Sequence, residues 1–197
     1  MPIDDSGSEP LASVMGWFDA AREAADPALV HLALATATPA GVPSLRMVLL
    51  RGLGPGGFVF YTDRSSRKAS ELAANPMAAA VLHWQAPRHR QVRAVGPVEP
   101  VSAAESDAYW ASRPAESRRS AMASHQSSVV ADLTELEARR AALEGLGEEA
   151  LVRPERWGGY RLRPVEVELW EERPHRFHER VRWRRVGDAW VSERLAP

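Results

Sequence analysis

The chain contains no cysteine, and this absence excludes several kinds of chemistry. Without thiolates there is no disulfide, no cysteine nucleophile, no Cys-ligated zinc and no iron–sulfur cluster. Lysine is nearly absent as well. Lys68 is the only lysine, and the other strongly basic residues are all arginines. This single position is therefore of interest.

The sequence also has little net charge and no long apolar run. A formal charge of −1 at pH 7 gives no support for non-specific nucleic-acid binding. No run approaches the length of a membrane span, and residues 1–10 are polar and acidic, without the apolar core of a secretory signal. We therefore expect a cytoplasmic protein with no nucleic-acid or membrane partner. Its 197 residues suit one domain, residues 11–197, after a disordered tail at residues 1–10.

Apolar periodicity, capping residues and turn residues predict a mixed helix and strand protein. The predicted helices are residues 10–25, 67–74, 102–112 and 133–146, and the predicted strands are residues 30–37, 47–50, 58–61, 77–85, 90–101, 160–170, 178–185 and 189–195. Residues 113–128 are polar and receive no assignment. Short turns between strands indicate antiparallel pairing, and there is no βαβ alternation. The fold class is therefore α+β: a closed antiparallel β-barrel with peripheral helices, not a Rossmann sheet.

Glycine, proline and serine residues add local detail to this outline. The Gly/Pro-rich residues 52–57 predict the turn of a β-hairpin. Pro97 and Pro100 place the second half of their strand at a sheet edge, because proline cannot donate to a ladder. Ser102 and Glu105 form a capping box that starts a helix.

The densest group of anion-binding residues lies at the start of the helix predicted at residues 67–74. Ser65 and Ser66 supply hydroxyls, Arg67 supplies a bidentate fork and Lys68 supplies a point charge. The helix N-terminus adds free N–H groups, and Ser65 is a candidate cap. These groups predict a phosphate socket, and a solvated basic turn is an equally acceptable interpretation.

Two further groups of polar residues suit an anionic ligand. Tyr109 and Arg113 are four residues apart, hence neighbours on a helical face, and Ser117 follows closely. The other group, on alternate positions of the last predicted hairpin, is Arg176, His178 and Arg180. Two phosphate sockets with a His/Arg face between them suit a phosphorylated cofactor beside a phosphorylated substrate. Scattered surface arginines are the alternative.

Other kinds of site find little support in the sequence. His175 and His178 are close, but no cluster of carboxylates and histidines completes a metal site. No GxSxG sequence occurs, and Ser127 has no His–Asp partner by motif, so hydrolase chemistry is unsupported. The GLGPGG run at residues 52–57 is not a dinucleotide fingerprint, because a strand follows it instead of a helix.

Several short sequences, in order along the chain, match one enzyme family. They are RMVLLR at residues 46–51, FYTDRSSRKA at 60–69, RQV at 90–92, YWASRPAES at 109–117, HQSS at 125–128, WGGYR at 157–161, ELW at 168–170, HRFHER at 175–180 and ERLAP at 193–197. On these sequences the chain resembles the pyridoxine/pyridoxamine 5′-phosphate oxidases, the FMN enzymes of vitamin B6 metabolism. The resemblance implies a split β-barrel homodimer with FMN at the subunit interface.

The resemblance also implies which residues form the site. FMN is expected at Arg46, Met47, Val48, Leu49, Leu50, Arg51, Tyr61, Thr62, Arg67, Lys68, Gln91, Gln126, Ser127, Trp170 and Arg180, with its phosphate near Arg67 and Lys68. The substrate is expected at Arg51, Tyr109, Arg113, Ser117, Arg176, Phe177 and His178, of which Arg176 and His178 orient its ring for catalysis. No metal is implied. In the implied reaction a hydride passes from a phosphorylated amine or alcohol to flavin N5, and dioxygen reoxidises the flavin to give hydrogen peroxide.

Four features differ from the usual family pattern. Arg51 stands where lysine is usual, RSAMAS at residues 119–124 replaces a GAWAS-like run, the ending reads RFHER instead of RLHDR, and we expect a short N-terminal extension. The related phenazine-biosynthesis oxidases share a HER-type ending, so an FMN-dependent oxidase of a dihydrophenazine is the first alternative. A flavin- or deazaflavin-binding module without B6 activity is the second, because a fold does not fix a function.

Overall fold

The computed structural model describes residues 3, 9–25 and 30–197, and its strands form one antiparallel sheet. The strands are β1 (His31–Ala37), β2 (Pro43–Gly54), β3 (Gly57–Asp63), β4 (Met77–Trp84), β5 (Arg90–Pro100), β6 (Trp157–Leu162), β7 (Glu166–Glu171), β8 (Glu179–Val186) and β9 (Ala189–Arg194). The helices are α1 (Pro10–Glu23), α2 (Arg67–Ala74), α3 (Ala103–Ser112), α4 (Ala115–Ala123) and α5 (Leu133–Ala141), with 3-10 turns at Glu148–Ala150 and Pro174–Arg176.

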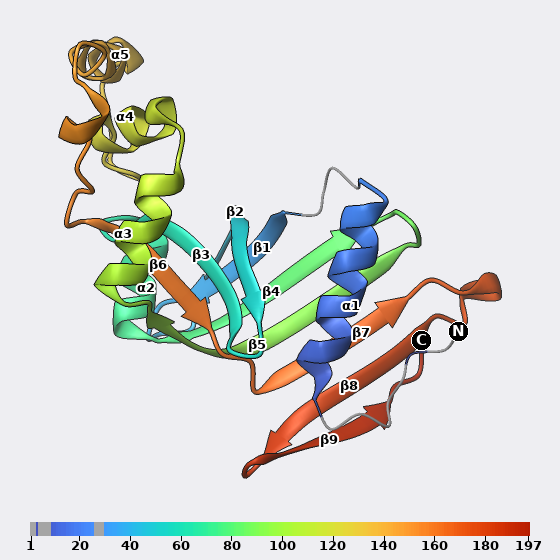
Figure 1. Ribbon diagram of the computed structural model, residues 1–197. Helices are drawn as coiled ribbons and strands as arrows, with labels where there is room; N and C mark the ends of the chain where they lie inside the picture. Colours follow the sequence, from blue (N-terminus) through green and yellow to red (C-terminus); the bar gives the residue numbers. More distant parts are fainter. Residues whose placement is uncertain (1–2, 4–8, 26–29) are drawn as a thin grey trace.

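The sheet closes on itself to form a barrel. Its strand order is β4-β1-β2-β3-β6-β5-β7-β8-β9, and an additional pairing joins β4 to β5. Six strands, from β4 around to β5, therefore make a closed barrel, while β7, β8 and β9 continue outward from β5 (Figure 1). The predicted class, a closed antiparallel β-barrel with peripheral helices, is confirmed.

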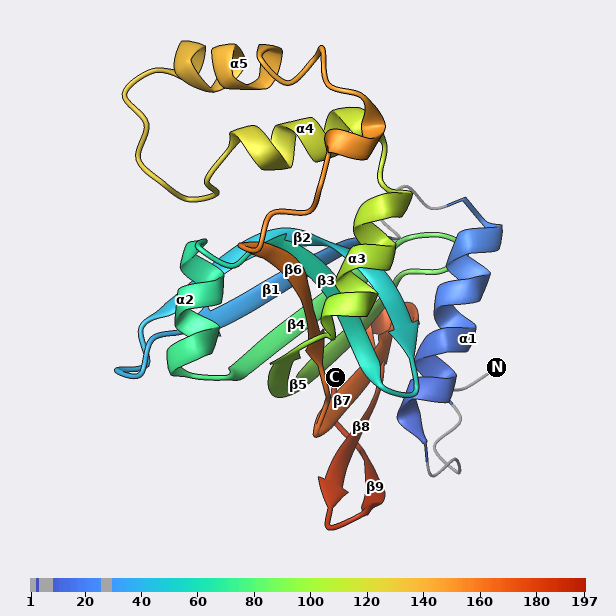
Figure 2. The same cartoon turned by 60° about the vertical axis from the view of Figure 1, so that its left-hand side comes forward.

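The core lies inside the barrel and beneath α1. Alternation along β1 buries Leu32 and Leu34, and facing strands add Phe60, Leu82 and Val92, each at most 1% exposed. Fully burying a side chain of this kind contributes about 1.5–3 kcal/mol. The helix α1 joins the same core, whereas α3, α4 and α5 lie on the other side of the barrel in Figure 1. Figure 2 shows α4 and α5 paired with each other, away from the sheet.

The hairpin at the centre of the sequence is longer than predicted. β2 continues through Gly54 and β3 starts at Gly57, so the predicted turn at residues 52–57 is wrong at its ends. Gly52 and Gly54 pair with β3 as ladder residues. Gly57 has a φ of 111°, and a Cβ there would overlap the Leu162 carbonyl, which explains why this position needs glycine.

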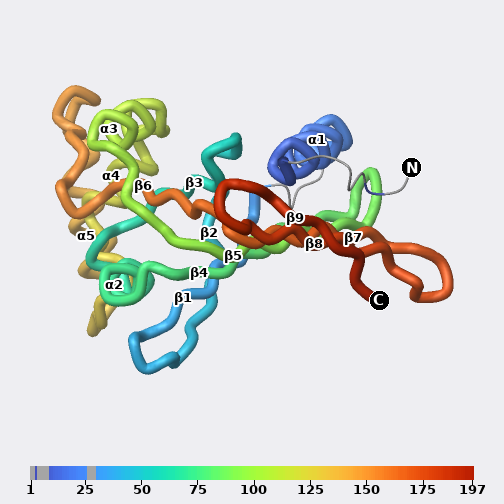
Figure 3. Tube along the Cα trace, turned by 90° about the horizontal axis from the view of Figure 1, so that it is seen from below, coloured from blue at the N-terminus to red at the C-terminus, as the bar shows by residue number. Residues whose placement is uncertain are grey.

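Two strand predictions were wrong in segments that contain proline. The second half of β5 is not a free edge, because residues 98–100 pair with β6 as the strand leaves β7. The strand predicted at residues 160–170 is two strands, since Pro164 lies in the break between β6 and β7. β6 pairs with β3, and β7 pairs with β5. The break therefore directs the chain from the barrel into its extension (Figure 3).

Helix starts were predicted with mixed success. The helix at residues 67–74 is confirmed as α2, but its N-cap is Ser66, which makes no side-chain cap bond. Ser65 instead donates its N–H and hydroxyl to Asp63. The Ser102 cap is confirmed, because its hydroxyl accepts from the Glu105 N–H. The helix α4 went unassigned because it begins after Pro114, in a polar sequence without a clear apolar stripe.

Much of the N-terminal tail predicted to be disordered, residues 1–2 and 4–8, lies outside the described residues. Ile3 is buried, and its N–H donates to Glu179 Oε1 at 2.9 Å. Pro10 is the first residue of α1. Within the part of the chain that the structure describes, no helix has both the length and the apolar character needed to cross a membrane.

Candidate functional site

A cavity of about 1280 Å³ brings together most of the residues predicted to form the site. The outer face of β2, the end of β3, the start of α2, and the α3–α4 corner line it. The predicted residues that line it are Arg46, Met47, Val48, Leu49, Arg51, Tyr61, Thr62, Arg67, Lys68, Tyr109, Arg113, Ser117, Gln126 and Ser127. Leu50 differs, since its side chain is 3% exposed, belongs to the core and lines a smaller cavity under α1.

Lys68 lies at one end of this cavity, with its ammonium group surrounded by neutral oxygen acceptors. Nζ donates to Gln126 Oε1 at 2.7 Å, Thr62 Oγ1 at 3.1 Å and Ser66 Oγ at 3.2 Å. The residue is only 5% exposed. Burial, reinforced by the charge of Arg46, lowers the pKa of Lys68 to about 8 against the opposing pull of Asp63. A buried cation without a carboxylate partner among the described residues is suited to an anionic ligand.

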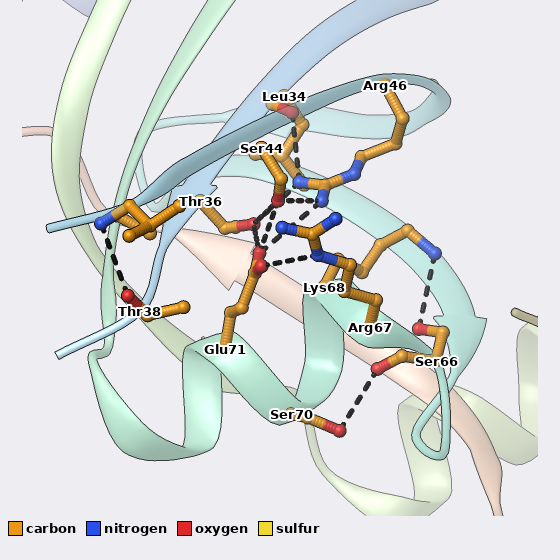
Figure 4. Close-up of polar contacts among 12 residues, drawn as sticks. Leu34, Thr36, Thr38, Ser44, Arg46, Ser66, Arg67, Lys68, Ser70 and Glu71 are labelled. Atoms are coloured by element: carbon orange, nitrogen blue, oxygen red, sulfur yellow. Dashed lines mark hydrogen bonds and ion pairs between the residues drawn. The ribbon is translucent and has the colours of Figure 1, made fainter. Parts of the chain in front are cut away.

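A buried carboxylate, Glu71 of α2, organises the arginines beside Lys68 (Figure 4). It accepts from Thr36 and Ser44 hydroxyls at 2.5 Å each and from Arg67 Nε at 2.8 Å. Burial raises the pKa of Glu71, but these hydrogen bonds and the Arg67 charge lower it to about 2. Glu71 therefore stays ionised and fixes Arg67, whose side chain remains 60% exposed and lines the cavity.

Arg46 is held more tightly than Arg67. Its Nη1 donates to the Leu34 carbonyl at 3.2 Å and to Thr36 Oγ1 at 2.6 Å, while Nη2 donates to Ser44 Oγ and, at 3.4 Å, to Glu71. Both terminal nitrogens are thus committed to the protein. Arg46 therefore affects the cavity through its charge, and it holds in place the groups that accept its hydrogen bonds.

The other end of the cavity contains a second cation, Arg113. Its guanidinium carbon lies 4.7 Å from the Trp157 ring centroid and 5.2 Å from that of Trp110. Its Nη1 is buried, with no hydrogen-bond partner among the described residues. Burial first, and then the charges of Arg51 and Arg118, lower the pKa of Arg113 against the opposing effect of Tyr109.

Aromatic side chains form the wall between the two ends. The rings of Tyr61 and Tyr109 stack with centroids 4.0 Å apart, and Trp157 lies 5.4 Å from Tyr61. Trp157 also contacts Trp110 edge-on at 4.9 Å. The cavity is therefore cationic at both ends, with a flat aromatic surface that suits a planar ring system.

Six predicted residues lie elsewhere, on the sheet extension and the turn before β8. Gln91, Trp170 and Arg180 are register neighbours across β5, β7 and β8. The remaining three are Arg176, Phe177 and His178. The prediction that Arg176 and His178 share a strand face with Arg180 is wrong. Arg176 belongs to the 3-10 turn and has a φ of 64°, a left-handed conformation that ends strand alternation.

A row of exposed apolar side chains crosses the open side of the cavity. Leu45, Met47 and Leu49 alternate along β2 and are 70%, 58% and 41% exposed. Within one chain, polar residues would be expected on the solvent face of such a strand. The row therefore indicates a surface that another protein surface covers.

Sequence reasoning missed three contributors to this site: Glu71, Ser44 and Trp157. Glu71 follows Arg67 by four residues, a spacing that pairs side chains on a helix, so that signal was present. Ser44 of β2 bonds Glu71 of α2, and Trp157 of β6 contacts Arg113 at the end of α3. Their roles depend on tertiary packing that local spacing does not encode.

Comparison with known proteins agrees with this arrangement. The family model described as pyridoxamine 5′-phosphate oxidase matches residues 21–146, and that described as pyridoxine 5′-phosphate oxidase C-terminal dimerisation region matches residues 157–197. The pyridoxine/pyridoxamine 5′-phosphate oxidase of Gluconobacter oxydans is 45% identical over 100% of this chain and 98% of its own length. That of Thermosynechococcus vestitus is 48% identical over 98% of this chain and 91% of its own length.

Solved structures give the same answer for the fold. PhzG from Burkholderia lata 383, in complex with tetrahydrophenazine-1-carboxylic acid, has a TM-score of 0.93 and 34% identity, covering 99% of this chain and 96% of its own. A pyridoxamine 5′-phosphate oxidase-related, FMN-binding protein of Nostoc punctiforme has a TM-score of 0.74 at 21% identity, with coverage of 94% and 96%, and supports the fold alone. By sequence and by structure, this chain belongs to the pyridoxine/pyridoxamine 5′-phosphate oxidase family.

Proposed function

We propose that this chain is an FMN-dependent oxidase that converts pyridoxamine and pyridoxine 5′-phosphates to pyridoxal 5′-phosphate. Dioxygen is the electron acceptor and hydrogen peroxide the product, with water consumed and ammonia released from the amine. The observation that carries the proposal is a single cavity with two separate cationic ends. One end suits the phosphate of a cofactor, and the other suits the phosphate of a substrate.

The first end fits the FMN phosphate. Arg67 offers its outer nitrogens, and Lys68, whose three donors are engaged by neighbouring oxygens, offers the charge of a buried ammonium group. Glu71 and Arg46 hold this end in place before any ligand arrives. Thr62, Gln126 and Ser127 would then line the path toward the ring system, a role carried over from the matching family positions.

The second end fits the substrate phosphate. The unpartnered Nη1 of Arg113 is a donor that a phosphate oxygen would satisfy, and Arg51 adds a second guanidinium close by. Tyr109 and Ser117 supply hydroxyls on the same wall. When bound, FMN supplies the redox chemistry by accepting two electrons from the substrate and passing them to dioxygen. The residues of the chain bind and orient the substrate, because no side chain has to act as an acid or a base for hydride transfer.

We also propose a homodimer whose partner completes each site. Arg176 and His178 do not line the cavity of their own chain, so they would reach the substrate ring in the cavity of a second copy. Gln91, Trp170 and Arg180 would meet the cofactor in the same way. The exposed row at Leu45, Met47 and Leu49 supports such a covering surface, and the family model matched by residues 157–197 is described as a dimerisation region.

An oxidase of a reduced phenazine remains the second candidate, supported by the close structural match to PhzG. It is less well supported in two respects. The two B6 oxidases described above are 45% and 48% identical to the chain, against 34% for PhzG. A tricyclic carboxylic acid also has no phosphate for the cationic end at Arg113.

An anaerobic reduction of the FMN-loaded protein tests the proposal. Pyridoxamine phosphate, pyridoxine phosphate and a dihydrophenazine are added in turn, and bleaching of the flavin absorbance is followed. We expect both B6 phosphates to bleach the flavin faster than the dihydrophenazine does. Bleaching by the dihydrophenazine alone would overturn the B6 assignment and favour the second candidate.

A further inference from the structure

The turn that carries Arg176 and His178 has an unusual backbone. His175 and Arg176 have φ values of 58° and 64°, so two consecutive non-glycine residues adopt the left-handed conformation. Such residues persist only where surrounding contacts over-determine them. Something outside the turn must therefore hold it.

Arg173, immediately before the turn, supplies those contacts. Its Nη2 lies 3.0 Å from Glu171 Oε1, at the end of β7, and 2.6 Å from Glu179 Oε2, at the start of β8. One guanidinium thus clamps together the two strand ends from which the turn projects. The Arg173 backbone N–H also donates to His178 Nδ1 at 3.4 Å.

The two carboxylates that Arg173 joins are themselves fixed. Glu171 is 1% exposed and accepts from Arg88 at 3.0 Å and from Arg90 Nε at 2.7 Å. Glu179 accepts from the Ile3 N–H at 2.9 Å and from Arg194 at 3.0 Å. The clamp is therefore anchored to β5, β9 and the N-terminal segment.

We propose that Arg173 is a positioning residue for Arg176 and His178, an assignment that rests on the proposed function. Because Nδ1 of His178 accepts a hydrogen bond, the ring proton belongs on Nε2. The His178 ring also packs 4.8 Å from the Trp170 ring, so its orientation is fixed from two sides. Releasing the clamp would let the turn relax to ordinary backbone conformations and misdirect both side chains.

Arg173→Ala tests the proposal, with Arg184→Ala as the matched control. Arg184 lies on β8 and pairs with Glu193 of β9, away from the turn. In FMN-loaded protein we expect Arg173→Ala to lower kcat/KM for pyridoxamine phosphate ~10- to 100-fold, the range expected for a misplaced orienting group. Calorimetry should show weaker binding of pyridoxal phosphate, while flavin content stays at the wild-type level. Arg173→Lys keeps the charge but loses the two-pronged guanidinium, so its kcat/KM and its affinity for pyridoxal phosphate should lie between those of the wild type and of Arg173→Ala.

Amide hydrogen exchange at residues 175–178 gives a readout that needs no substrate. We expect exchange there to accelerate at least about tenfold in Arg173→Ala and to stay unchanged in Arg184→Ala. Unchanged exchange in Arg173→Ala would overturn the inference, whatever the enzyme oxidises. Accelerated exchange with unchanged kcat/KM and pyridoxal phosphate affinity would equally overturn it, because Arg173 would then be merely structural. A wild-type protein inert toward both B6 phosphates would count against the proposed function instead.

Discussion

Replacing Arg113 by alanine separates substrate recognition from cofactor binding. A charge-assisted, bidentate contact with a phosphate contributes about 1.5–3 kcal/mol. Its loss corresponds to a decrease of roughly ten- to over a hundred-fold in kcat/KM, expressed mainly as a higher KM. Because Arg113 lies at the opposite end of the cavity from Lys68, flavin content should not change.

The structure also sets the expected effect of this substitution on stability. Arg113→Ala removes two cation–π contacts, with Trp110 and Trp157, worth about 0.5–1 kcal/mol each. It also removes a buried donor whose missing partner costs about 1–3 kcal/mol. The two changes largely offset each other. The backbone N–H of Arg113, which bonds the Trp110 carbonyl at 3.1 Å, survives the substitution, so the end of α3 keeps that contact.

Steady-state oxidation of pyridoxamine phosphate, with flavin content and melting temperature measured on the same samples, decides the matter. Arg140→Ala is the control, since Arg140 pairs with Glu116 and Glu144 on the outer helices. An unchanged KM in Arg113→Ala would refute the substrate assignment of Tyr109, Arg113 and Ser117. A lowered melting temperature with unchanged KM would instead identify Arg113 as a helix-capping residue. Either result would move the phenazine alternative ahead.

Three further predictions concern the cofactor end and the dimer. Arg67→Ala should lose FMN on dialysis while the melting temperature of the FMN-free protein changes little, because Arg67 is largely exposed. Lys68 has a folded-state pKa of about 8, below its ordinary 10.5. Between these two pH values the unfolded chain binds more protons than the folded chain does. The free energy of unfolding of the FMN-free protein should therefore increase as pH rises from about 8 to 10.5. Urea unfolding at pH 8 and pH 10 checks this, and a Lys68→Met variant that keeps the gain would contradict it. Met47→Glu should convert a dimer to monomers in light scattering, since it puts a charge in the exposed apolar row.

Local sequence patterns sufficed wherever one element alone decides the outcome. The bounds of α2 and the Ser102 cap follow from residues within a few positions of each other. The alternation along β5 likewise places Val92 and Ala94 inside and Arg93 outside. Such features depend on side-chain periodicity and capping chemistry, which short-range spacing encodes directly.

Prediction failed where a distant contact overrides local preference. The stretch predicted as one strand at residues 160–170 alternates throughout, but its two halves pair with different partners on either side of Pro164. Arg176 and His178 have strand-like spacing, yet the Arg173 clamp holds their turn in a left-handed conformation. Each of the two cationic ends could be read as a local cluster. Their position in one shared cavity could not be predicted, because β2, α2 and the α3–α4 corner meet around it only in the folded chain.

Charge balance explains why the cofactor end suits a phosphate ester better than a carboxylate. Arg46, Arg67 and Lys68 contribute three positive charges, and Glu71, ionised down to a pKa of about 2, contributes one negative charge. Asp63 does not alter this balance, because Arg156 pairs with it at 2.8 Å. The remaining two charges match a phosphate monoester, which carries about −1.5 to −2 at neutral pH.

The substrate end repeats this balance with different residues. Arg51 and Arg113 both act there, and the nearby carboxylate of Glu116 is already paired with Arg119 and Arg140. A monoanionic carboxylate at this end would balance only one of the two guanidinium charges, whereas a phosphate monoester comes close to balancing both. Arginine in place of the usual lysine at position 51 keeps the positive charge at this end and changes only the geometry of its donors. Under the proposed function, the charges at both ends of the cavity match two phosphate monoesters better than one phosphate monoester and a carboxylate.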